Sequence, residues 1–268
     1  MRTIVLIAWY ELYRLFLTKR GLLSLLSFGL VWFLILRYAI YGAAQFFQVD
    51  NVGGMIASLF ESGIINNLMS WQVPELAMFW VVMLYLLPIF CVMLTADQTA
   101  SDRARGTLRV LHLRASRDGI FFGRFIGQML ILLFLTVIAL ATTLALVMMR
   151  DSSQLLPALR LSAIVLVNLM LVLLPYTALM AWVSSMARSA RQATTYAVII
   201  WIVCSIVTGW LSRQFPELWI LDMVLPGSQV TSLLYLSGWN TLSLALIPIV
   251  QTVILLFCGR MIMQRSDW

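Results

Sequence analysis

The chain has 268 residues, of which 62% are hydrophobic and only 11% are charged, and its formal net charge is +7. Soluble domains carry about 25% charged residues, so this composition excludes a soluble enzyme or a soluble binding domain. We predict an integral membrane protein. The segments between its apolar runs are short, so we expect one membrane domain over residues 1–268 with no separate catalytic domain.

The segment 1–20 predicts a helix that lies in the membrane interface. Large apolar side chains recur at helical spacing along one side: Trp9, Leu12, Tyr13 and Phe16. The opposite side is polar and holds Glu11, Arg14 and Thr18. Because such two-sided helices settle at the boundary between lipid and water, we expect this one to precede the first span and to turn into it at Gly21.

Six apolar runs are long enough to cross a hydrocarbon layer, which takes about 20 helical residues. They lie at about 22–41, 76–94, 125–148, 161–186, 193–211 and 242–261. Backbone groups in lipid must be paired within their own segment, and the alternating pattern of a barrel strand is absent. The predicted fold is therefore an all-α integral membrane protein with six transmembrane helices. We expect the first apolar run to be retained, because it is longer than the roughly 7–15 residues of a signal-peptide core.

Basic residues set the expected orientation of these helices. Fourteen of the eighteen lie near the chain ends or in the connections after the second and fourth spans, which share one side of the membrane. Because cytoplasmic segments carry the excess of Lys and Arg, we predict that both termini are cytoplasmic. The bases are spread over helix ends rather than gathered on one face, so the positive charge indicates contact with membrane lipid and no nucleic-acid partner.

Motifs for catalysis or metal binding are missing from the sequence. Cys91, Cys204 and Cys258 lie in predicted spans without paired spacing, and His112 is the only histidine. The single lysine, Lys19, follows no glycine-rich run, so the chain has no phosphate-binding loop with which to hydrolyse ATP. We therefore expect that the chain is not an enzyme and that it holds no metal and no cofactor.

The connection at 97–119 is the most informative polar segment. Gly106 is expected to end a helix that continues from the second span, and Thr107 can cap a new short helix. Leu108 and Leu111 would then share one face of that cytoplasmic helix, which suits the groove of a partner protein. The alternative is a solvated, positively charged loop without a partner.

A motif in this connection resembles the corresponding loop of bacterial ABC transporter permeases of the ABC-2 type. That loop has the pattern Glu-Arg-x-x-Gly-Thr-Leu-Glu, then a Pro-x-Ser-Arg turn, then Gly-Lys. The matching positions here are Arg103, Gly106, Thr107, Leu108, Ser116, Arg117, Gly123 and Arg124. The departures are Asp102 for the glutamate, Arg109 for an acid, and Ala115 without a proline nearby. The resemblance extends to the whole chain, through the order of an interfacial helix, six spans and a broken amphipathic segment before the last span.

This resemblance implies a function in transport. The chain would be the transmembrane subunit of an ATP-binding-cassette exporter in the bacterial inner membrane. Its partners would be a second permease chain, identical or similar, and two ATPase subunits that bind ATP and Mg²⁺. Seven residues would couple the ATPase to the spans: Arg103, Arg105, Gly106, Thr107, Leu108, Arg109 and Leu111. The alternative is a non-transporting membrane scaffold or assembly subunit, which would share the topology and need no ATPase.

The fifth predicted span carries a stripe at helical spacing: Trp201, Ser205, Thr208 and Ser212. By the resemblance, a substrate path would run between the second and fifth spans of two facing subunits, and this stripe would line it. Hydrogen bonding and close packing between helices is the alternative for the stripe, as it is for Asn168 and Gln251 in other spans.

The segment 213–240 lies before the last span and has two short halves separated by Pro226-Gly227. Each half is too short to cross the membrane, and the Pro-Gly pair forces a turn. By the resemblance, the segment would be a re-entrant helical hairpin that forms a lid on the outer side. Two interfacial helices anchored by Trp219 and Tyr235 are the alternative.

Overall fold

The computed structural model describes residues 2–42, 62–104, 106–107, 111, 113–215 and 223–265. In these ranges every regular element is a helix, so the predicted all-α fold is confirmed. Six helices are long and apolar enough to cross a membrane: Gly21–Ile40, Pro74–Thr95, Arg117–Arg150, Ser152–Met186, Ala190–Gln214 and Gly238–Arg265. The third and fourth begin well before the predicted starts at 125 and 161, because their first turns are polar and extend beyond the apolar run.

The bounds of the elements are as follows in chain order. The first half of the chain forms α1 (Arg2–Leu17), α2 (Lys19–Leu34) with its π-helical continuation η1 (Ile35–Ile40), α5 (Ser62–Met69), α6 (Pro74–Thr95) and α7 (Ala100–Ala104). The second half forms α9 (Arg117–Arg150), η2 (Ser152–Gln154), α10 (Leu155–Met186), α11 (Ala190–Gln214), α12 (Val230–Tyr235), η4 (Gly238–Leu244) and α13 (Leu246–Arg265).

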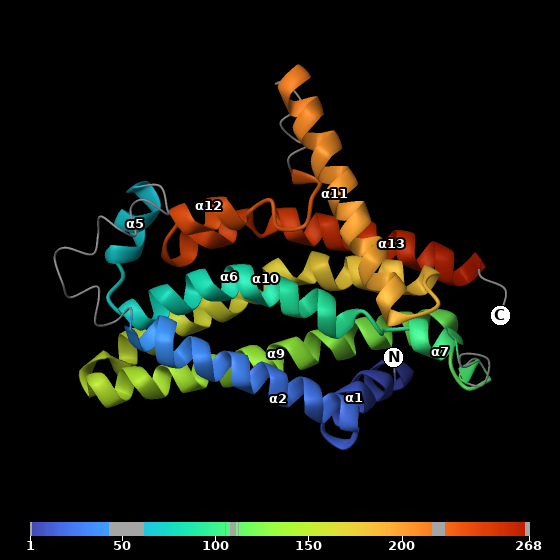
Figure 1. Cartoon of the computed structure of the whole chain (residues 1–268), viewed down its shortest axis with the longest axis horizontal. Coiled ribbons are helices and arrows are strands. Elements are labelled where there is room, and N and C mark those ends of the chain that lie inside the picture. The colour runs from blue at the N-terminus through green and yellow to red at the C-terminus, as the bar shows by residue number, and fades with distance from the viewer. Residues whose placement is uncertain are drawn as a thin grey trace.

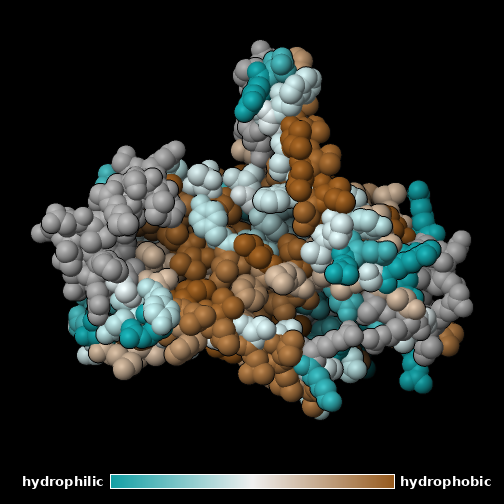
Figure 2. All heavy atoms as spheres, viewed as in Figure 1, coloured by the Kyte–Doolittle hydropathy of each residue, from teal (hydrophilic) through white to brown (hydrophobic). Residues whose placement is uncertain are grey.

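The helix α10 lies at the centre of the bundle, where it packs against α6, α9 and α13, while α1 packs against α9. Figure 1 shows these helices running alongside one another. Apolar side chains cover the middle of the molecule, and hydrophilic ones collect toward its ends (Figure 2). We call the end that holds α7 and the start of α9 the loop end, and the end that holds α5 and α12 the far end.

A sharp corner joins α1 to α2. Thr18 has extended backbone, and its hydroxyl accepts a hydrogen bond from the Gly21 amide at 3.0 Å and donates one to the Arg14 carbonyl at 3.0 Å. A Cβ atom on residue 21 would lie 2.2 Å from the Leu15 carbonyl oxygen, so only glycine fits there. The turn that was predicted at Gly21 therefore begins earlier, at Thr18. Gly21 allows the two helices to approach each other closely.

The helix α11 points away from the other spans (Figure 1). Its main contacts are with α10 and α7, and only 11% of its most apolar stretch is buried within the chain, against 56% for α6. Ile202, Ile206 and Trp210 are among the large apolar side chains exposed along it. An apolar surface of this extent is expected to face lipid or another protein chain.

The second half of the connection between α11 and α13 folds back onto the bundle. Gln251 of α13 donates hydrogen bonds to the carbonyls of Met223 and Leu225 at 2.5 and 2.9 Å. A turn follows at Pro226-Gly227, as predicted, and α12 then buries Val230, Leu233 and Leu234. Trp219 and the rest of 216–222 lie outside the described residues, so the choice between a re-entrant hairpin and two interfacial helices stays a prediction.

Candidate functional site

The connection between α6 and α9 begins inside the bundle. α6 ends at Thr95, and the next residues turn inward instead of extending the helix. Gln98 Nε2 donates to the Thr177 carbonyl of α10 at 3.2 Å, and the Thr99 hydroxyl lies 3.1 Å from a serine hydroxyl of the same helix. The prediction that one helix continues from the second span to Gly106 is therefore wrong, because these contacts bend the chain before α7.

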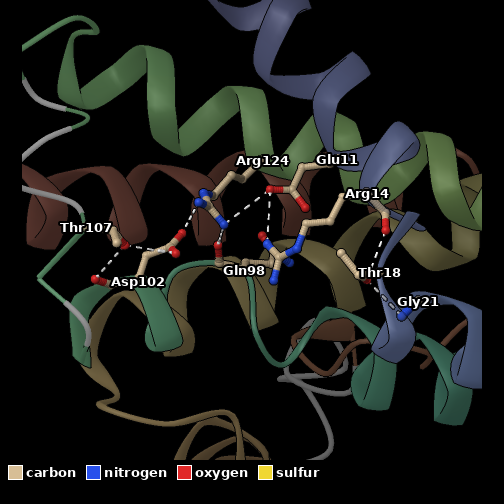
Figure 3. Close-up of polar contacts among 8 residues, drawn as sticks. All are labelled: Glu11, Arg14, Thr18, Gly21, Gln98, Asp102, Thr107 and Arg124. Atoms are coloured by element: carbon tan, nitrogen blue, oxygen red, sulfur yellow. Dashed lines mark hydrogen bonds and ion pairs between the residues drawn. The ribbon is translucent and has the colours of Figure 1, made fainter. Parts of the chain in front are cut away.

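Arg124 of α9 lies at the centre of a polar cluster that includes Gln98 and Asp102 of this connection (Figure 3). The residue is only 6% exposed. Its Nη2 donates to the carboxylate of Asp102, in α7. Its Nη1 donates to the Gln98 carbonyl and lies 3.3 Å from Oε1 of Glu11, in α1. One buried guanidinium thus joins α1, the connection and α9, as a buried charge requires if it is not to remain unpaired.

Glu11 is buried, although the sequence placed it on a polar side opposite the large apolar side chains. The structure turns that polar side onto α9 and leaves Trp9 and Tyr13 exposed. Arg14 Nη1 lies 3.7 Å from the Glu11 carboxylate on its other flank. Burial raises the pKa of Glu11 above its ordinary value, and the positive charges of Arg124 and Arg14 oppose that rise. The stability that Glu11 contributes is therefore lost as the pH rises through this raised pKa.

Three motif positions, Asp102, Thr107 and Arg124, form one unit. The Thr107 hydroxyl lies 3.1 Å from both the carbonyl oxygen and Oδ1 of Asp102, so it bonds back to α7. Between them, Gly106 ends α7 with a φ of +71°, a left-handed conformation that favours glycine. Arg103 Nη1 donates to a carbonyl at the end of α10 at 2.6 Å. The motif therefore fixes the connection onto both α9 and α10.

Two glycines allow α1 to lie directly against α9. A Cβ atom on Gly123 would lie 2.9 Å from Cβ of Ile7. One on Gly127 would lie 2.8 Å from Cβ of Glu11 and 3.2 Å from the backbone of Ala8. Gly-x-x-x-Gly is the spacing by which membrane helices approach closely. Gly123 was expected only as part of the loop motif, and its spacing to Gly127 is the sequence signal that could have revealed this packing.

The structure describes four of the seven predicted coupling residues: Arg103, Gly106, Thr107 and Leu111. Arg105, Leu108 and Arg109 lie outside the described residues. Leu111 packs against the apolar cluster of Ile120 and Phe121 at the start of α9, so it is partly buried within the chain. Leu113 is 85% exposed instead. Leu113 was not among the residues predicted from the sequence, yet of the two described leucines of the connection it is the one exposed to a partner.

The residues predicted for the substrate path are Trp201, Ser205, Thr208 and Ser212, which share one side of α11. Trp201 is 49% exposed and Thr208 is buried. The Ser205 and Thr208 hydroxyls each donate to a carbonyl one turn earlier in α11, at 2.8 Å. Asn168 does make the expected bond between helices, to the Thr241 hydroxyl of η4 at 2.7 Å. That the stripe lines a path stays a prediction.

The chemistry at the loop end is hydrogen bonding and ion pairing. Within the described part of the chain, no three His, Cys, Asp or Glu side chains lie together in a way that could hold a metal ion. A family model described as "ABC-2 family transporter protein" matches residues 7–268 of the chain, and this match decides the family. The chain belongs to the ABC-2 transporter family. A comparison with curated proteins finds no match.

Membership in the ABC-2 family confirms the resemblance seen in the loop motif. The chain is a multi-pass membrane component of an ATP-binding-cassette transporter, and its family associates with an ABC ATPase carried by a separate subunit. In this ABC-2 permease, the acid and the base of the motif have a structural explanation. Its acid, Asp102, and its base, Arg124, bond each other across the space between α7 and α9.

Proposed function

We propose that this ABC-2 permease is one half of an exporter of the bacterial inner membrane, working as a pair of membrane chains with two ATPase subunits. The ATPase subunits bind ATP and Mg²⁺, and the loop end faces them in the cytoplasm. Three observations support this: the family match, the excess of basic residues at the loop end, and a sequence with no phosphate-binding loop. A second copy, or a similar chain, supplies the facing wall of the substrate path.

The Arg124 cluster is the observation that carries the proposal. It ties the connection that would meet the ATPase to α1 and α9, through Asp102 and Glu11. Breaking a buried ion pair costs about 3–5 kcal/mol, so α7, α1 and the start of α9 move together. α9 has 34 residues, which is about 50 Å of continuous helix. A displacement of the connection by the ATPase is thereby passed along α9 to the far end.

The contact with the ATPase is made by the exposed part of the connection. Leu113 offers an unburied apolar side chain, and Leu108 is the leucine that the motif places beside Gly106 and Thr107. Arginines at the rim of such a contact steer association more than they add affinity. Arg105 and Arg109 are assigned this role, whereas Arg103 is held by its bond to α10.

Replacing Leu113 with aspartate is expected to weaken binding of the ATPase about tenfold or more, and Leu108→Asp is expected to do the same. A leucine buried in a partner contributes about 1.5–3 kcal/mol, and about 1.4 kcal/mol is one decade in affinity. The insertion of the spans should persist, because the connection lies outside the hydrocarbon. Pull-down of the cognate ATPase by wild-type and variant chains, at matched membrane levels, measures the effect.

Met149→Asp is the matched control, because Met149 is 84% exposed and lies at the other end of α9. It makes the same apolar-to-acid change away from the loop end and should leave ATPase recovery unchanged. Equal recovery by wild type and both leucine variants, with transport intact, would mean that the connection is only a solvated loop. Unaltered recovery together with a lack of ATP-dependent transport would favour a membrane scaffold.

Cysteine labelling tests the orientation. Ser189 at the loop end and Ser153 at the far end are both exposed, whereas Ser228 has a buried hydroxyl and is a poor reporter. In a chain without its native cysteines, an impermeant thiol reagent added to intact cells should label Ser153→Cys and spare Ser189→Cys. The reverse pattern would place the loop end outside the cell and remove the ATPase from its proposed side.

A further inference from the structure

A cavity of about 410 Å³ opens at the far end of the bundle. Its wall comes from three segments: residues 70–72 before α6, the first turns of α10 with Arg160 and Leu161, and Ser237 before η4. It shares no residue with the Arg124 cluster or with the stripe on α11. Neither the coupling role nor the substrate path therefore accounts for it.

Bonds within the chain hold the wall of this cavity together. Asn67 Nδ2 donates to the carbonyls of Leu234 and Leu236 at 2.8 and 3.2 Å, which ties α5 to the end of α12. Figure 1 shows these two helices beside each other at the far end. The Ser70 hydroxyl donates to the Asn67 carbonyl at 2.6 Å. The cavity is therefore formed before any ligand arrives, which lowers the cost of binding.

One charged hydrogen-bond donor in the lining has no partner among the described residues. Arg160 is exposed and makes no ion pair with any residue in the described ranges. Nε1 of Trp71 also donates to no acceptor there, but it is buried and closed off from solvent, so Arg160 is the donor that the cavity presents. By contrast, Arg150 at the same end is paired with Glu75 at 2.7 Å. Among the described residues, no acid compensates the positive charge at the cavity, and this charge favours an anion.

The cavity closes toward the membrane interior. Trp71, Leu161 and Gly238 also line a second space of only about 10 Å³. Its floor includes Asn168 and Thr241, which are bonded to each other at 2.7 Å. A space of this size holds one water at most. An acyl chain cannot enter it, whereas a compact charged group can sit at the mouth.

We propose that this cavity binds a phosphate group, carried by a lipid head group or present as free phosphate. A guanidinium offers two parallel N–H donors that match two phosphate oxygens. α6 and α10 begin beside the cavity, which places it where apolar spans give way to polar segments and lipid head groups lie. The assignment depends neither on the direction of transport nor on the ATPase.

Native mass spectrometry of the purified full chain in an uncharged detergent tests this site. Dioleoylphosphatidylglycerol is compared with dioleoylglycerol, which has the same acyl chains and no phosphate. Wild type should bind the phospholipid at least about tenfold more tightly. Arg160→Gln should remove about tenfold of that affinity. Arg160→Lys keeps the positive charge but lacks the two parallel N–H donors of the guanidinium, so it should recover part of the lost affinity.

Arg213→Gln is the control, because Arg213 is an exposed arginine at the end of α11 that does not line the cavity. It makes the same charge change and should leave the affinity unaltered. Equal losses in Arg160→Gln and Arg213→Gln, or equal binding of the two lipids, would overturn the proposal. Competition by millimolar inorganic phosphate identifies the source: displacement of the lipid assigns the site to free phosphate as well, and retention assigns it to the head group.

Discussion

Arg124→Met is expected to lower the free energy of unfolding by about 3–5 kcal/mol, the cost of breaking a buried ion pair from one side. The replacement has a similar length, but it leaves Glu11 and Asp102 without the guanidinium that neutralises them. Denaturant titration of the chain in detergent measures the change. The loss should shrink as the pH falls through the raised pKa of Glu11, because a protonated carboxyl leaves no buried charge behind.

Arg260→Met provides the comparison at the same end of the bundle. Arg260 pairs with Asp118 at 2.7 Å, but the two side chains are 44% and 38% exposed. Exposed pairs contribute about 0–1 kcal/mol, so this variant should be nearly as stable as wild type. If both arginine variants lost the same free energy, the buried cluster would not be the element that ties α1 and α7 to α9.

Gly127→Leu is expected to push α1 away from α9 and to destabilise the chain by about 1–3 kcal/mol, the usual cost of overpacking. Even the first carbon of the new side chain would lie 2.8 Å from Cβ of Glu11 and 3.2 Å from the backbone of Ala8. Displacing α1 separates Glu11 from Arg124, so coupling to the ATPase should fall as well. Tryptic cleavage after Arg14 in detergent reports the displacement, since a detached α1 is cut faster.

Gly209→Leu serves as its counterpart, because a Cβ atom on Gly209 of α11 meets no other atom within 4 Å. This variant should keep the wild-type rate of cleavage after Arg14 and the wild-type ATPase coupling. Faster cleavage in both variants would point to a general loosening caused by leucine in a span. Unchanged cleavage in Gly127→Leu would contradict the close contact between α1 and α9.

The sequence reveals the loop motif, but it does not show which residues the motif contacts within the chain and which it leaves exposed to a partner. Thr107 and Arg124 match the family pattern, and Asp102 stands where the pattern has glutamate. The structure shows that Asp102 bonds both of the others. Sequence spacing suggested Leu108 and Leu111 for the partner contact because both fit one face of a short helix. The structure buries part of Leu111 against α9 and exposes Leu113, because the course of the connection depends on contacts with α9 and α10.

Glu11 shows why a polar side of a helix is ambiguous. Helical periodicity correctly separated it from the large apolar side chains of α1, and water was the natural environment to assign to it. Its actual environment is a guanidinium from a helix far along the chain. Periodicity gives the direction of a side chain relative to its own helix axis, and it contains no information about what another helix presents there.

The sequence by itself determined the class of the protein, the number of its spans and its family motif. This is possible because each span must satisfy its own backbone in lipid and needs about 20 apolar residues, which is a local requirement. The tertiary structure alone decided that α1 docks on α9, that Arg124 joins three segments, and that Arg160 and Trp71 line one cavity. These features depend on pairings between residues distant in the chain, which are selected by close packing and by the need to pair buried charges.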